Sequence, residues 1–160
     1  MKTWVLAILL IGTVVPSVTN AGDGYVSVEG DRFTGQTKVH YRASGDKEDR
    51  LYLLAVGLRE DETKSARLGF ISGRESWKYL KCHDLHWLID DERLDLPASR
   101  HAGDVRANGV VETVVQKFTV EQLERVGAAG KVEYRICNDT GFLSPDEIKA
   151  VSDVAAALKG

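Results

Sequence analysis

Hydrophobic and polar positions alternate along the front two thirds of the chain in the manner of β-strands. Within residues 37–43, Val39 and Tyr41 alternate with charged or polar side chains, which is typical of a strand with one buried face. Residues 51–58 are nearly all apolar, and such a run predicts a central strand with both faces covered. We therefore expect four consecutive side chains of this strand to be buried: Leu53, Leu54, Ala55 and Val56.

Shorter apolar runs predict the remaining strands, and polar segments predict the turns between them. Strands are expected over residues 68–71, 77–96 (a pair joined by the acidic turn 90–93) and 110–118. Turns are expected over residues 44–49 and 60–65, and residues 97–109 are expected to form the longest irregular segment.

The hydrophobic period changes in the last third of the chain. Thr119 followed by Gln122 matches a capping box, so a short helix should begin there and end at the glycines that follow. Residues 131–137 alternate again, as expected of a strand. Ser144 followed by Pro145 combines a helix cap with a residue suited to the first helical position, which predicts a C-terminal helix.

These elements predict an α+β fold: an antiparallel β-sheet or β-sandwich with two helices in the C-terminal third. A parallel α/β fold is disfavoured because no helix separates the first strands. The chain has 160 residues and no linker-like segment, so we expect a single β-rich globular domain over residues 22–160.

Residues 1–21 have the pattern of a secretory signal peptide. Lys2 is the only charge before Asp23, a mostly apolar stretch follows it, and Thr19 and Ala21 suit the positions that flank a cleavage site. An uncleaved membrane anchor is the alternative, but a bilayer span needs roughly 20 apolar residues. We therefore expect an extracytoplasmic protein, periplasmic or secreted, without stable membrane insertion after cleavage.

Composition narrows the classes of protein and partner. The chain is 43% apolar and 28% charged, which fits a globular protein better than a disordered chain or a multi-span membrane protein. Its formal net charge is −3 and its basic residues are scattered, so nothing indicates nucleic-acid binding.

The chain has two cysteines, Cys82 and Cys137. In an oxidising compartment an even pair favours one disulfide, and the alternative is two buried free thiols. Neither site looks like the middle of an apolar core, so we expect the bridge, which would place residue 82 beside the strand 131–137. Closing a loop of this length would stabilise the fold by at most about 4 kcal/mol.

The triplet Asp139-Thr140-Gly141 matches the active-site triplet of aspartic proteases. The chemistry needs two carboxylates that share one proton, and too little chain follows the triplet to frame a site. A turn is therefore the favoured interpretation.

Two further clusters resemble metal sites without meeting their requirements. Cys82, His83 and His86 have no evident fourth ligand, and side chains 83 and 86 would point to opposite faces of a strand. The acidic turn 90–93 lacks the spacing of a calcium loop and suits a solvated hairpin tip. We predict no catalytic residue, no metal site and no cofactor.

These features favour a small exported protein that acts without catalysis, by binding an unknown protein or envelope component. A structural or chaperone-like envelope component is a second hypothesis. A third is a secreted hydrolase with a site assembled from dispersed residues, of which His83, His86, Asp84 and His101 would be tested first.

We expect the mature protein to begin at Gly22, because the cleavage pattern ends at Ala21. Sequencing the N-terminus of protein recovered from outside the cytoplasm checks this. A soluble cytoplasmic protein that keeps Met1 would contradict the predicted localisation.

Overall fold

A computed structural model describes residues 18–21, 24–43, 51–60 and 63–159 of the chain. They form a large antiparallel sheet of seven strands in the order β1-β2-β3-β4-β5-β9-β8 and a small antiparallel sheet of four in the order β11-β10-β6-β7. The strands are β1 (Val18–Ala21), β2 (Gly24–Gly30), β3 (Thr37–Ala43), β4 (Leu51–Glu60), β5 (Thr63–Arg74), β6 (Leu85–Ile89), β7 (Glu92–Arg93), β8 (Arg100–Arg106), β9 (Gly109–Phe118), β10 (Val132–Ile136) and β11 (Asp139–Phe142). The helices are α1 (Val120–Gly127) and α2 (Pro145–Lys159).

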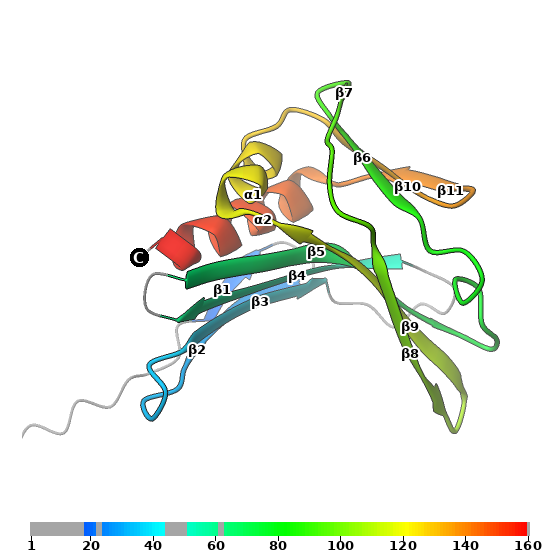
Figure 1. Cartoon of the computed structure of the whole chain (residues 1–160), viewed down its shortest axis with the longest axis horizontal. Helices are drawn as coiled ribbons and strands as arrows, with labels where there is room; N and C mark the ends of the chain where they lie inside the picture. The colour runs from blue at the N-terminus through cyan, green and yellow to red at the C-terminus, as the bar shows by residue number, and fades with distance from the viewer. Residues whose placement is uncertain (1–17, 22–23, 44–50, 61–62, 160) are drawn as a thin grey trace, which may run out of the picture.

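The second layer of the molecule covers one face of the large sheet (Figure 1). Helix α2 contacts β1 to β4, α1 packs beside α2 and against β5, and the small sheet extends this layer over β9. The arrangement is sandwich-like and confirms the α+β class with two helices in the last third of the chain.

Several predicted features fall wholly or partly outside the described residues. They are residues 1–17 of the predicted signal peptide, the turn 44–49 and the tip of the turn 60–65. Within the described ranges, no helix is both long enough and apolar enough to cross a bilayer.

Aromatic side chains join the small sheet to the large one. Phe70 of β5 stacks on Trp87 of β6, with ring centroids 5.5 Å apart, and lies 4.2 Å from the ring of Tyr134 on β10. Trp87 also meets Phe118 of β9 edge to face. The indole nitrogen of Trp87 donates a hydrogen bond to the side-chain oxygen of Gln116 at 2.8 Å, so this buried donor is satisfied.

Both predicted helix starts are confirmed. Thr119 accepts a hydrogen bond from the Gln122 backbone, and the Gln122 side chain accepts one from the Thr119 backbone, which completes the capping box. Ser144 and Glu147 form the same reciprocal pair at the start of α2. These local bonds satisfy amide groups that the first helical turn leaves without partners.

The expectation of a doubly covered strand at 51–58 is only half right. β4 is central in the large sheet, and Leu53 and Ala55 are fully buried beneath the second layer. Leu54 and Val56 are only partly buried, because they point to the opposite face, on which no described helix or sheet packs. The apolar run therefore marks the centre of the sheet without marking a covered second face.

Residues 97–109 were expected to be irregular, and this is wrong, because β8 occupies Arg100–Arg106 and pairs with β9 along its whole length. β8 is an edge strand that is exposed almost throughout, so its side chains show no apolar alternation. Backbone pairing rather than burial holds it in place. The pair of strands expected over 77–96 is shorter than predicted, since β6 begins only at Leu85, and the turn into β7 is Asp90-Asp91 rather than four residues.

We expect Leu53→Ala to lower the free energy of unfolding by about 2–5 kcal/mol, because the substitution leaves a cavity in the core. The matched variant Leu54→Ala, one residue along the same strand, should cost less than about 1.5 kcal/mol because its side chain is only partly buried. Denaturant unfolding of both variants measures the difference. Equal losses would show that the second face of β4 is covered.

Candidate functional site on the small sheet

The small sheet turns one face to the core and the other to solvent. Along β6, Trp87 and Ile89 are buried while His86 and Leu88 point outward. The same alternation holds in β10, where Arg135 is exposed. Because the strands are in antiparallel register, outward side chains of neighbouring strands lie directly beside one another.

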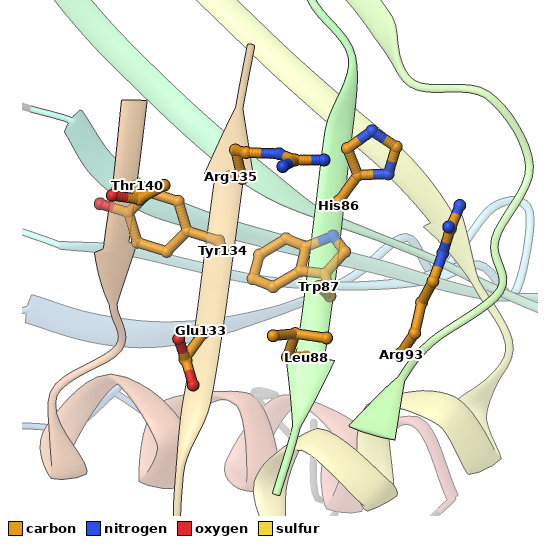
Figure 2. A pocket seen from close by; sticks show the side chains of 8 residues that line it. All are labelled: His86, Trp87, Leu88, Arg93, Glu133, Tyr134, Arg135 and Thr140. Atoms are coloured by element: carbon orange, nitrogen blue, oxygen red, sulfur yellow. The ribbon is translucent and has the colours of Figure 1, made fainter. Parts of the chain in front are cut away.

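A hollow of about 240 Å³ opens on this sheet (Figure 2). Its lining residues come from all four strands of the small sheet and are His86, Trp87, Leu88, Arg93, Glu133, Tyr134, Arg135 and Thr140. Arg135 is one of the lining residues, paired in register with His86 of β6 on one side and with Thr140 of β11 on the other. Figure 2 shows the side chains of Arg135 and His86 extending next to each other.

Arg135 has no hydrogen bond or ion pair with any other residue that the structure describes. The second arginine of the hollow, Arg93, has its Nε 3.6 Å from a carboxylate oxygen of Asp95. Both of those side chains are largely exposed, so this ion pair contributes little and leaves Arg93 available. Two guanidinium groups therefore face solvent around one hollow.

The carboxylate in the hollow, that of Glu133, is already bound. Lys131 Nζ lies 2.5 Å from its Oε1 and 2.9 Å from Oδ1 of Asp91. Hydrogen bonds to Glu133 and Asp91 raise the pKa of Lys131, so its positive charge is retained beside Glu133. The negative charge of Glu133 is balanced locally, and the arginines make the hollow cationic.

Apolar side chains flank these charges. Leu88 is 37% exposed and Phe142 is 63% exposed, and both lie beside Glu133 in the sheet register. Large apolar groups next to arginine are characteristic of binding surfaces, since they combine desolvation with directional hydrogen bonding. The hollow and these flanks form what we call the small-sheet site.

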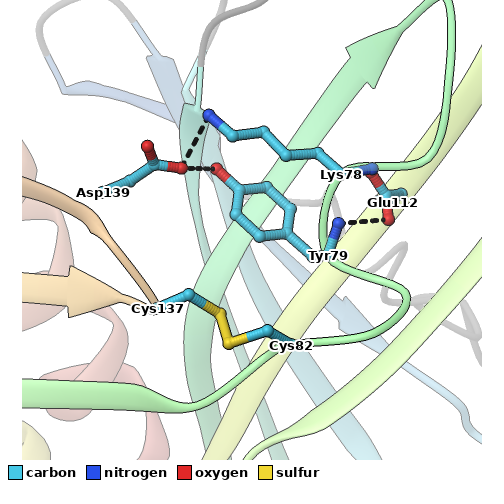
Figure 3. A network of polar contacts seen from close by, with 6 residues as sticks. All are labelled: Lys78, Tyr79, Cys82, Glu112, Cys137 and Asp139. Carbon is cyan, nitrogen blue, oxygen red and sulfur yellow. Dashed lines mark hydrogen bonds and ion pairs between the residues drawn. A yellow bond between two sulfur atoms is a disulfide. The ribbon is translucent and has the colours of Figure 1, made fainter.

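The predicted disulfide between Cys82 and Cys137 is confirmed, with the two Cα atoms 6.1 Å apart (Figure 3). Cys137 occupies the turn between β10 and β11 with φ of 54°, and its backbone N–H donates to the carbonyl of Asp84. The bridge therefore connects the chain entering β6 to the turn that carries β11. It holds together the strands on which the small-sheet site is built.

A polar network beside the disulfide attaches the same turn to residues 78 and 79 (Figure 3). Oδ2 of Asp139 accepts a hydrogen bond from the Tyr79 hydroxyl at 2.7 Å and lies 2.7 Å from Lys78 Nζ. Burial acts to raise the pKa of Asp139, but the hydrogen bonds from Lys78 and Tyr79 outweigh it and lower the pKa. Burial and the hydrogen bond to Asp139 raise the pKa of Tyr79, so the phenol keeps its proton and donates it.

The triplet 139–141 therefore has a structural role. Asp139 begins β11 and uses its carboxylate to hold Lys78 and Tyr79, whereas protease chemistry would require a second carboxylate beside it. The turn expected from Asn138, Asp139 and Gly141 lies at Cys137 and Asn138, and residues 139–141 belong to β11 instead.

Buried Glu112 of β9 holds the other side of the same segment. Its two oxygens accept the backbone N–H groups of Lys78 and Tyr79 at 2.8 and 2.9 Å. Oε1 also lies 3.0 Å from Nε2 of His101, whose side chain is 9% exposed. Every polar atom of this carboxylate is thus engaged, as a buried carboxyl group requires.

The histidines proposed for a dispersed hydrolase site separate into two groups. His83 and His101 stack with ring centroids 5.6 Å apart, near Glu112. His86 lies on the outer face of the small sheet. The zinc-like grouping is broken because Cys82 is oxidised, and no cluster of metal-binding side chains occurs in the part of the chain that the structure describes.

No protein-family model, curated protein or solved structure matches this chain. The small-sheet site therefore stands on its own geometry. The alternation of residues 131–137 places Arg135 and Glu133 on the polar face of a strand, but it could not identify their neighbours on β6, which lie 45 to 49 residues away in the chain. The acidic turn 90–93 was expected to be free in solvent, yet Asp90 accepts hydrogen bonds from the backbone of Gly130 and Lys131.

We expect Glu112→Gln to lower the free energy of unfolding by about 1–3 kcal/mol, because the new amide would place an N–H group against backbone N–H donors. Glu75→Gln, an exposed substitution just before the same segment, is the matched control and should be nearly neutral. Denaturant unfolding measures both. A Glu112→Gln protein as stable as the control would show that the carboxylate does not hold this segment.

Proposed function

We propose that this protein is exported and acts without catalysis, by binding an acidic group of another protein or of an envelope component at the small-sheet site. The observation that carries the proposal is Arg135, an exposed arginine that lines a hollow and has no partner among the described residues. Export is supported by the signal-peptide pattern of residues 1–21 and by the disulfide, which is typical of proteins in oxidising compartments.

The side chains of the site specify the chemistry of its ligand. A guanidinium group presents paired N–H donors that match carboxylate and phosphate oxygens. Arg93 adds a second guanidinium, while Leu88 and Phe142 offer apolar contact at the rim. The chain as a whole is acidic, so this cationic site concentrates anionic partners locally rather than through the net charge of the molecule.

The same residues favour binding over catalysis. General acid or base chemistry needs a titratable group held within hydrogen-bond reach of a reacting atom and oriented by a partner. Glu133 is occupied by Lys131, and His86 has no hydrogen bond to a carboxylate within the described ranges. Arg135 and Arg93 suit recognition of charge rather than proton transfer, since arginine stays protonated in proteins.

A hydrolase is the second candidate, and the contact between His101 and Glu112 is the observation that favours it. A carboxylate bonded to a histidine orients the ring as catalytic dyads do. Against this, both oxygens of Glu112 already hold the backbone of residues 78 and 79, and the His101 side chain is almost fully buried. A screen with hydrolase substrates, with and without added divalent metals, would detect such an activity, and its loss in His101→Asn would assign it.

We expect Arg135→Glu to weaken binding of an acidic probe at least tenfold, because it reverses the charge of an arginine that lines the site. The probes are a peptide of alternating glutamate and phenylalanine, which represents a protein partner, and phosphatidylglycerol vesicles, which represent an envelope surface. Amide chemical shifts would be followed for the peptide, and co-sedimentation for the vesicles.

The matched control is Arg100→Glu, which reverses an exposed arginine on the edge strand of the other sheet. On addition of the peptide, changes in amide chemical shift should cluster at residues 86–93, 133–135 and 140–142. Binding should weaken as the salt concentration is raised. If Arg135→Glu and Arg100→Glu weaken binding of the probe equally, the affinity depends only on the net charge of the protein. The absence of binding to both probes would contradict an acidic ligand.

A further inference from the structure

The two edges of the large sheet differ in how they are protected. β8 forms one edge and carries Arg100, Asp104 and Arg106, and charged side chains on an edge strand discourage pairing with another chain. β1 forms the other edge, where its four residues pair with residues 24–27 of β2. The last three residues of β2 extend beyond that pairing.

The predicted cleavage after Ala21 would remove β1 and leave β2 as the edge of the sheet. β2 has seven residues, contains neither lysine nor proline, and has one charged residue, Glu29, near its end. Lysine and proline, two residues with which proteins often protect edge strands, are thus missing from β2. Val26 is buried and Val28 is partly buried on the inner face of β2, so the hydrophobic core extends to this edge of the sheet.

We propose that the mature chain forms a twofold dimer by antiparallel pairing of β2 with the β2 strand of a second copy. The inference rests on the export and cleavage proposed above. With Ser27 on the twofold axis, Tyr25 lies opposite the partner's Glu29, and Val26 lies opposite the partner's Val28. No like charges face each other in this register, and the apolar inner row continues from one copy into the next.

The structure shows that this edge accepts an extended strand. β1 pairs there antiparallel to β2, which is the orientation that the second copy requires. Helix α2 reaches over this border and contacts both β1 and β2, so a strand added at the edge lies beneath the helix as β1 does. A seven-residue strand from a second copy also offers backbone partners to residues 28–30, which β1 leaves unpaired.

The direct test compares two forms of the chain by analytical ultracentrifugation over about 1–200 µM. Residues 22–160 should sediment as a dimer with twice the monomer mass at the upper concentrations. Residues 18–160, which retain β1, should remain monomeric because their edge is occupied. Since the shorter form is produced directly, its result does not depend on whether a host removes the signal peptide.

A cysteine variant tests the register. Ser27→Cys places one new thiol on the proposed axis, beside the same thiol of the second copy, and the described residues contain no other free cysteine. Mild oxidation should convert residues 22–160 carrying this variant to a covalent dimer. The control Ser65→Cys, on β5 away from either edge, should not be cross-linked. Ser27→Lys should abolish the dimer, because two ammonium groups would then face each other.

A form 22–160 that stays monomeric throughout this range would overturn the proposal, as would equal dimerisation of 18–160. A dimer that forms without Ser27→Cys cross-linking would overturn the β2 register. The acidic-probe titration of Arg135→Glu reports on the small-sheet site, whereas the proposed dimer forms at the β2 edge of the large sheet. Failure of the dimer can therefore be distinguished from failure of the binding function.

Discussion

The placement of the small sheet depends on the buried carboxylate of Glu112. Its oxygens accept two consecutive backbone N–H groups and so fix the segment that leaves β5 against β9. Tyr79 is thereby positioned to donate its hydroxyl to Asp139, the first residue of β11. One carboxylate on the large sheet is thus connected through two bonded residues to the far edge of the small sheet. The disulfide from Cys82 to Cys137 reinforces the same connection covalently.

Packing around this network requires a small residue at one position. A Cβ atom on Gly103 of β8 would meet the ring of Trp77 at 2.4 Å, so the glycine makes room for the indole beside His101. Gly103 of β8 thus lets the partly exposed Trp77 ring pack against this edge strand, although most side chains of β8 are exposed.

The small-sheet site follows from these constraints. The ring contacts of Phe70 with Trp87 and Tyr134 hold the inner face of the small sheet against the large sheet. Because the core takes one face, the alternating side chains of β6, β10 and β11 must all face outward together. Arg135 is exposed on that face for this geometric reason, and no other described residue forms a hydrogen bond or ion pair with its side chain.

Local interactions could be predicted from the amino-acid sequence because their partners are close in the chain. The caps at Thr119 and Ser144 join residues three positions apart, and strand alternation is a property of consecutive residues. The disulfide was also predictable, since the chain has two cysteines and an export pattern. Tertiary structure alone decided that Leu54 and Val56 lie on an uncovered face, that residues 100–106 form a strand, and that Arg135 meets His86. The first and the third depend on packing and pairing between segments tens of residues apart, which leave no local periodicity to reveal them. Residues 100–106 pair with the next strand in the chain, but their mostly exposed side chains show no apolar alternation.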